Sequence, residues 1–182
     1  MELLEAARLD QILFCPSGQN PLKANPLHAL PTHRKKMVEL AIAGIDGFGS
    51  IETELWQEAP CYTVDTLHQL KKQLDGSLPA YQLFLLLGED AAATFYRWHQ
   101  PEEIVQLATP LVGSRLLPER KPCLYEGSPS VVRALQEGSY PTRLFELSSS
   151  EVRQRLKEQK AIEHLLPQDV WRYIRQEGLY AS

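Results

Sequence analysis

Apolar and polar positions along the chain follow two rhythms, one typical of short buried strands and the other of amphipathic helices. The clearest strand is Gln82–Leu87, an apolar run bounded by Pro79 and Gly88. Its continuous apolar character predicts a central strand of a parallel sheet, covered on both faces. Four further segments predict strands: Phe48–Leu55 by its alternation of apolar and polar residues, and Ile12–Cys15, Pro110–Gly113 and Arg143–Leu147.

Helical spacing of apolar residues fills most of the intervals between these strands. The predicted helices are, in chain order, one that carries Leu3, Leu4 and Ala7, one capped by Thr32 and ending near Gly44–Gly47, one from Val64 to Leu74, one around Glu102–Leu107, one around Val131–Leu135, one from Ser148–Ser150 to about Gln159, and one from Pro167 to Gly178. The segment Pro16–Pro31 is rich in Pro, Gly and Asn and predicts a loop.

This order of strands and helices predicts an α/β fold with a doubly wound parallel sheet, in which ligands bind at the carboxyl ends of the strands. No internal repeat or low-complexity segment divides the sequence, so we expect a single domain over residues 1–182. A doubly wound unit ordinarily begins with a strand that feeds its first helix. Here the predicted helix comes first, so we expect one strand to be missing at the amino end.

Composition narrows the functional classes. No stretch approaches the roughly 18 apolar residues of a membrane span, and no secretory signal is visible, so we expect a cytoplasmic protein without a membrane partner. A net charge of −4 argues against an extended nucleic-acid surface. The three cysteines form no C-x-x-C pair and the five histidines no metal-ligand spacing, so we predict no protein metal site.

The strongest local signal is Phe145–Arg153, in which an apolar run leads into three serines and then a helix with a cation in its first turn. Free N–H groups and the positive end of the helix dipole favour an anion at such a turn, and Arg153 can pair with phosphate. The alternative is that Ser148 or Ser150 simply caps the helix, with Glu151 in a favourable acidic first turn. The spacing alone favours neither interpretation.

This segment resembles the I-S-S-T-x-[IV]-R signature of the nucleotidyltransferase superfamily, with Ser150 in place of the threonine. Further blocks, in the same order and at similar spacing, resemble the nicotinate mononucleotide adenylyltransferases of that superfamily: Pro16–Lys23, His33–Met37, Ala59–Leu67, Leu87–Asp90 followed by Trp98, and Leu166–Tyr180. The resemblance covers essentially the whole chain. It implies a Rossmann-like fold and adenylyl transfer from ATP to nicotinate mononucleotide in NAD synthesis.

The resemblance also implies roles for individual residues. It places Ser148, Ser149, Ser150 and Arg153 at the ATP phosphates, Gly88 and Asp90 at the adenosine side, Lys23 near the substrate phosphate, Tyr62, Thr63 and Thr66 at the nicotinate carboxylate, and Trp98 on the pyridine ring. It implies Mg²⁺ as a cofactor with the triphosphate, and an arginine near the triphosphate at Arg115.

The residues by themselves leave plainer interpretations open. Without its neighbours, Trp98 is interpreted as a packing aromatic and Lys23 as a solvated cation. Asp90 equally fits a helix N-cap before Ala91–Ala93. We assign no role to His99, which matches only a variable aromatic position of the family.

The family's G-x-F-D-P-x-H-x-G-H motif, with its first strand and two phosphate-binding histidines, is not found in the sequence. We therefore expect roughly one βα half-unit to be absent, through a late start codon, a truncated chain or a degenerate protein. Three interpretations remain: an active enzyme that begins upstream, a non-catalytic nucleotide-binding remnant, or an adenylyltransferase for another phosphate acceptor such as phosphopantetheine. The oligomeric state is not predicted.

Overall fold

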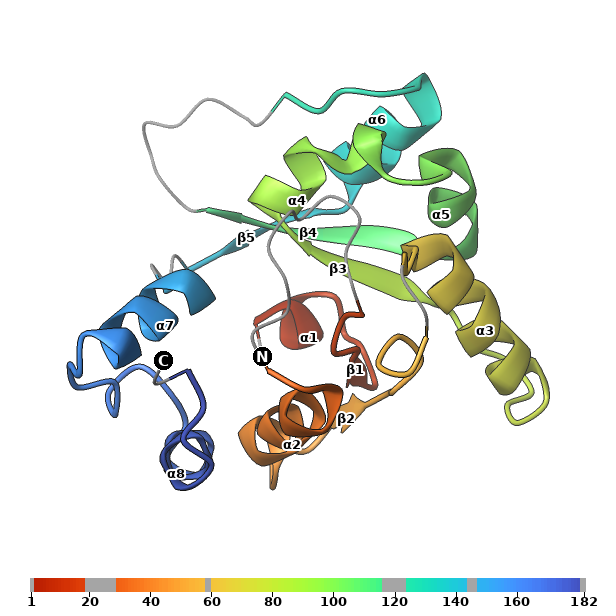
Figure 1. Ribbon diagram of the computed structural model, residues 1–182. Helices are drawn as coiled ribbons and strands as arrows, with labels where there is room; N and C mark the ends of the chain where they lie inside the picture. The colour runs from red at the N-terminus through yellow and green to blue at the C-terminus, as the bar shows by residue number, and fades with distance from the viewer. Residues whose placement is uncertain (1, 19–28, 58–59, 116–123, 144–146, 181–182) are drawn as a thin grey trace. The chain divides into compact units, whose positions relative to one another are not determined.

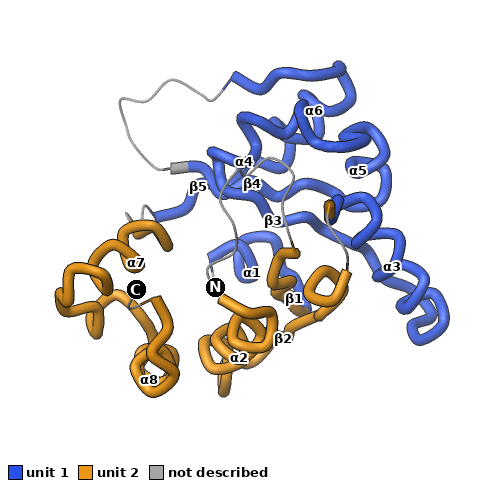
Figure 2. Tube along the Cα trace, viewed as in Figure 1, with its two compact units in different colours: residues 1–10, 61–144 blue, residues 11–60, 145–182 orange. Residues whose placement is uncertain are grey.

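The computed structural model describes residues 2–18, 29–57, 60–115, 124–143 and 147–180. By their internal contacts the residues divide into two compact units, each built from separate stretches of chain (Figure 2). Unit 1 comprises residues 1–10 and 61–144, and unit 2 comprises residues 11–60 and 145–182. The expected single domain over residues 1–182 stays a prediction.

Unit 1 is built on a parallel three-stranded sheet in the order β3-β4-β5 (Figure 1). Its strands are β3 (Phe84–Gly88), β4 (Thr109–Arg115) and β5 (Ser139–Thr142). Gly88 of β3 pairs with Gly113 of β4, so the carboxyl ends of these strands lie at one edge of the sheet. The parallel arrangement predicted from the sequence is confirmed.

The helices of unit 1 are α1 (Glu2–Ala6), α3 (Thr63–Asp75), α4 (Glu89–Ala93), the 3₁₀ helix η1 (Phe95–Arg97), α5 (Pro101–Leu107) and α6 (Pro129–Glu137). Some of these helices precede the strands of unit 1, and the others connect them: α4, η1 and α5 lie between β3 and β4, and α6 lies between β4 and β5. Figure 1 shows α4, α5 and α6 on the same side of the sheet.

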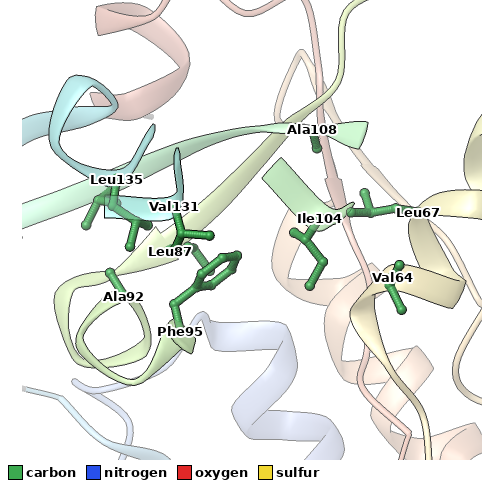
Figure 3. Packing of buried hydrophobic residues seen from close by; sticks show 10 residues of the cluster. Val64, Leu67, Leu87, Ala92, Phe95, Ile104, Ala108, Val131 and Leu135 are labelled. Carbon is green, nitrogen blue, oxygen red and sulfur yellow. The ribbon is translucent and has the colours of Figure 1, made fainter. Parts of the chain in front are cut away.

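A continuous apolar core holds unit 1 together. It joins residues of α3, β3, α4, α5 and α6 to Phe95, whose side chain is fully buried and lies beside Val131 and Leu87 (Figure 3). The buried members of the cluster are Val64, Leu67, Leu87, Ala92, Phe95, Ile104, Ala108, Val112, Val131 and Leu135. This core fixes the backbone on which the candidate site of unit 1 is built.

The described residues of unit 2 form a parallel pair of short strands, β1 (Ile12–Phe14) and β2 (Phe48–Ser50), and three helices. The helices are α2 (Pro31–Ile42), α7 (Ser149–Lys157) and α8 (Gln168–Gln176). The α2 and α8 helices pack on one another, and His33 Nδ1 lies 2.8 Å from the Tyr173 hydroxyl.

Several details differ from the sequence-based expectations. Thr32 does not cap α2, because the helix begins two residues earlier than such a cap requires, with Pro31 at its first position and Leu30 as the N-cap. The expected strand Phe48–Leu55 ends at Ser50, and the strand expected at Arg143–Leu147 is instead Ser139–Thr142. Residues 144–146 of that expectation lie outside the described residues.

The run Gln82–Leu87 was expected to be a central strand, but β3 begins at Phe84 and pairs only with β4 in the described sheet. Thus β4 is the central strand of unit 1, and the expectation for β3 is wrong. A continuous apolar run indicates that both faces of a strand are buried. It does not indicate how many strands pair with it.

In the described part of the chain, no helix is long and apolar enough to cross a membrane.

Candidate substrate-binding site

The amino end of α3 presents backbone N–H groups. Tyr62 is the N-cap residue, with extended backbone and no side-chain capping bond. Its carbonyl accepts from the N–H groups of Asp65 and Thr66, at 3.1 and 3.2 Å. The N–H groups of Thr63 and Val64 therefore point out of the open helix end, where an anion is favoured by the helix dipole.

The hydroxyl of Thr66 forms a hydrogen bond within the same helical turn. It is buried, with 7% of its surface exposed, and its Oγ1 donates to the Tyr62 carbonyl at 3.3 Å. The Thr66 side chain thus holds the backbone of Tyr62 in place. The sequence pattern predicted the helix start but not this internal bond.

Trp98 lies at a tight corner between η1 and α5. Its backbone N–H donates to the Phe95 carbonyl at 2.9 Å, and the centroid of its ring lies 5.0 Å from that of Phe95 at an interplanar angle of 38°. Because Phe95 belongs to the core cluster, the Trp98 ring has a rigid support on one side.

His99, to which the sequence gave no role, connects the Trp98 corner to α3. Its ring centroid lies 4.4 Å from that of Tyr62, at an interplanar angle of 33°. The structure therefore brings the Tyr62 block and the Trp98 corner together in unit 1, although 35 residues lie between Tyr62 and Trp98 in the printed sequence. The features of the sequence that could have identified His99 were its position directly after Trp98 and its aromatic ring.

The carboxyl end of β3 carries the next expected pair. Gly88 is the last residue of β3 and the N-cap of α4, and Asp90 is an exposed residue in the first turn of this helix. Asp90 is thus not an N-cap, contrary to the simpler alternative. A Cβ on Gly88 would meet nothing within 4 Å, so there is open space beside the strand end.

The serine turn lies in unit 2, at the start of α7. Ser148 is the N-cap, and its hydroxyl accepts from the Glu151 N–H at 3.1 Å. The capping interpretation is therefore confirmed for Ser148. Ser149 and Ser150 occupy the first exposed positions of the helix, and Arg153 Nη2 donates to the Ser150 hydroxyl at 3.2 Å. This bond keeps a guanidinium next to the open amino end of α7.

Two arginines gather near Tyr180 in the same unit. Burial raises the pKa of the Tyr180 phenol, and the charges of Arg153 and Arg34 act in the opposite direction. Arg34 also donates to the carbonyl of Ser17. The sequence had named Arg34 only as part of a matching block, and its electrostatic effect on Tyr180 became visible only in the structure.

Other expected contributors are placed only in part. Lys23 lies outside the described residues, and Arg115 is the last residue of β4. Among the residues that the structure describes, no group of three or more His, Cys, Asp or Glu side chains could hold a metal ion.

The parallel α/β architecture, with its helix starts at the ends of strands, is that of a Rossmann-like nucleotidyltransferase. The solved structure of Plasmodium falciparum nicotinic acid mononucleotide adenylyltransferase complexed with NaAD is similar, with a TM-score of 0.61 over 94% of this chain and 83% of that chain. At 19% sequence identity this similarity concerns the fold.

Sequence relatives define the family more narrowly. The chain is 35% identical over 182 residues to the probable nicotinate-nucleotide adenylyltransferase of Dehalococcoides mccartyi, covering 98% of this chain and 86% of the relative. It is 34% identical over 174 residues to the protein of the same name from Bacillus pumilus, covering 96% and 84%. No protein-family profile matches the sequence. The chain belongs to the nicotinate-nucleotide adenylyltransferase family.

Proposed function

We infer that this chain transfers the adenylyl group of ATP to nicotinate mononucleotide, giving nicotinate adenine dinucleotide and pyrophosphate. The observation that carries this inference is the 35% identity to a probable nicotinate-nucleotide adenylyltransferase across 98% of the chain. The open amino end of α3 beside Trp98 supports it, because a pyridine carboxylate needs both N–H donors and an aromatic face.

In this reaction, a phosphate oxygen of the mononucleotide attacks the α-phosphorus of ATP. A new P–O bond forms, and the bond from the α-phosphorus to the bridging oxygen breaks, so that pyrophosphate leaves with that electron pair. The nucleophile is already an anion at neutral pH, and no side chain has to remove a proton. The protein therefore contributes chiefly by holding two anionic substrates in line and by neutralising charge.

We assign the ATP phosphates to the start of α7. The N–H groups after Ser148, the hydroxyls of Ser149 and Ser150, and the Arg153 guanidinium supply donors and positive charge at one place. Mg²⁺ enters this scheme as part of the MgATP substrate, since Mg²⁺ is commonly held through substrate phosphates with few protein ligands.

We assign the pyridine ring to the face of Trp98 and its carboxylate to the N–H groups of Thr63 and Val64. Thr66 acts in this proposal through the carbonyl of Tyr62, which it holds.

The remaining assignments concern the adenosine ribose and the phosphate of nicotinate mononucleotide. Gly88 leaves room at the end of β3 for the adenosine ribose, and the Asp90 carboxylate can accept from its hydroxyls. Lys23 is proposed as the cation near the substrate phosphate, on the family resemblance alone.

Pyrophosphate release tests this function. We expect release to require both ATP and nicotinate mononucleotide, and we expect Arg153→Gln to lower the rate by roughly 10²–10³-fold, as loss of one charge-stabilising donor does. The matched control is Lys157→Gln, which removes the same charge from an exposed position in the last turn of α7. Equal rates for the two variants would contradict the role of Arg153.

A second arm of the assay uses a form extended at its amino end with the histidine-bearing segment of the family. We expect this form to be faster, by roughly 10²–10³-fold for each donor that the histidines add. If neither form releases pyrophosphate although both are folded and bind ATP, the adenylyl-transfer function is wrong and nucleotide binding alone remains.

A further inference from the structure

The ring pair Tyr62–His99 joins two segments that the proposed function uses separately. Tyr62 precedes the N–H groups assigned to the nicotinate carboxylate, and His99 follows the tryptophan assigned to the pyridine ring. The two rings lie 4.4 Å apart between centroids, at 33°, which is at the short end of the separations found for aromatic pairs.

The residue that follows His99 has an unusual backbone conformation. Gln100 has φ 53° and ψ 57°, a left-handed conformation that is costly for a residue with a side chain and is directly followed by Pro101. Such a conformation persists only where the surrounding contacts fix it. Here the Gln100 carbonyl accepts from the N–H groups of Glu103 and Ile104, both at 3.1 Å.

The corner that carries Trp98 is thus fixed by the core and by the turn into α5. Phe95 supports the tryptophan ring from the core, and Gln100 fixes the turn into α5. On the side of α3, the contact of His99 with Tyr62 sets the separation between the corner and the helix start. A flat ligand that needs both an aromatic face and N–H donors depends on that separation.

We propose that His99 is a positioning residue for nicotinate mononucleotide, which acts through its ring contact with Tyr62 to hold the Trp98 corner against the amino end of α3. This proposal rests on the proposed function. The contact is made by the face of the imidazole, so an aromatic ring without nitrogen can replace it.

The α3 and α5 helices offer a matched control for this contact. His68 of α3 lies 2.8 Å from the Glu103 carboxylate of α5, measured from Nε2 to Oε1, and both side chains are substantially exposed. Removing His68 loosens the same pair of helices without touching Tyr62 or Trp98. A general loss of packing would therefore affect both variants, whereas loss of positioning affects only the His99 variant.

The test is calorimetric binding of nicotinate mononucleotide, and separately of ATP, to the full chain. We expect His99→Ala to raise the Kd for nicotinate mononucleotide about tenfold, the upper range for loss of an aromatic pair. We expect His99→Phe and His68→Ala to stay within about threefold of the unaltered chain, and the Kd for ATP to be unchanged in all three. Thermal unfolding of each variant verifies that it is folded.

A double-mutant cycle keeps the test decisive if His99→Ala proves unstable. His99→Leu removes the aromatic ring while keeping much of the side-chain volume, so it should raise the Kd for nicotinate mononucleotide in the unaltered chain. In a Tyr62→Leu background the ring contact is already lost, so His99→Leu should change the Kd no further. The proposal is overturned if His99→Ala binds as well as the unaltered chain, if His99→Phe binds as weakly as His99→Ala, or if His68→Ala is equally weakened. Failure of the unaltered chain to bind nicotinate mononucleotide would instead reject the proposed function itself.

Discussion

Ser148 is the serine of its motif that caps the helix α7. Its hydroxyl accepts from the Glu151 N–H and so caps α7, which leaves Ser149 and Ser150 exposed at the helix start. The residue types predicted an anion-binding turn and a cap equally well, because both need a hydroxyl before a helix. Only the geometry shows which of the three serines is used for capping.

Contacts between distant residues were the part of the site that sequence could not predict. The contact of His99 with Tyr62 and the gathering of Arg34 and Arg153 near Tyr180 depend on how the elements pack. The helical and strand periods of the apolar residues indicate which face of an element is buried. They do not indicate which other element packs on that face. The residues matched to the family motif are therefore predictable, and their supporting neighbours are not.

Tyr81 gives a prediction about pH at the residue scale. Its phenol donates a hydrogen bond to the Asp75 carboxylate, and this bond, with burial and the carboxylate charge, raises the pKa of Tyr81 to about 12. An unfolded chain has a tyrosine pKa of about 10. The folded state thus holds this proton more tightly, and the resulting stabilisation is complete below pH 10 and is lost between about pH 10 and 12.

We therefore expect the unaltered chain to be more stable than Tyr81→Phe at pH 8, and this advantage to shrink steadily from pH 10 upward. Urea denaturation of both proteins at several pH values between 8 and 11.5 measures the difference. A difference that stays constant over this range would show that the Asp75 bond does not depend on the protonated phenol.

At the scale of elements, the sequence predicted most helices and strands but misplaced some of their ends. The α3 and α8 helices fall where their apolar spacing predicts, because each buries a stripe against a core. A strand was expected at Arg143–Leu147, whereas the pairing with β4 that the structure describes lies earlier in the chain, at Ser139–Thr142. Hydrogen-bonded pairing is a non-local property that a run of apolar residues does not specify.

The turn between α6 and β5 depends on a glycine for reasons of space. Gly138 is the C-cap of α6 with an ordinary φ of −87°, and its carbonyl accepts from the Val112 N–H at 2.8 Å. A Cβ at this position would lie 1.9 Å from the Pro110 carbonyl oxygen. The close approach of β4 to this turn is therefore possible only without a side chain.

We expect Gly138→Ala to lower the free energy of unfolding by about 1–3 kcal/mol, as overpacking does. The control is Gly76→Ala at the C-cap of α3, where φ is −86° and the nearest atom to a Cβ would lie at 3.8 Å. This change should stay within about 0.5 kcal/mol. Urea denaturation gives both values, and equal losses would mean that the close contact at Gly138 is relieved by a backbone shift.

At the scale of the whole molecule, the two compact units differ in their cores. The largest fully buried side chains of the described residues, among them Phe95, Ile104 and Leu135, all belong to unit 1. Unit 2 is held by smaller groups of apolar residues such as Val152, Ile162 and Ile174. Since burial of apolar area is the main source of stability, unit 1 should be the more stable unit.

The tryptophans allow the stabilities of the two units to be compared by fluorescence. Trp56 and Trp171 lie in unit 2 and Trp98 lies in unit 1. We expect a Trp98→Phe variant, which reports on unit 2, to show its fluorescence transition at a lower urea concentration than a variant that retains only Trp98. Coincident transitions in the two proteins would indicate that the chain unfolds as one cooperative unit.

Neither unit is a continuous stretch of chain, since residues 11–60 separate the two parts of unit 1 and residues 61–144 those of unit 2. During synthesis, the contact of His33 with Tyr173 must wait until 140 further residues have been added. At ordinary rates of translation this takes roughly 7 to 28 s. The α2 helix therefore leaves the ribosome long before its partner α8 exists, and its unpartnered face is available to chaperones throughout that interval.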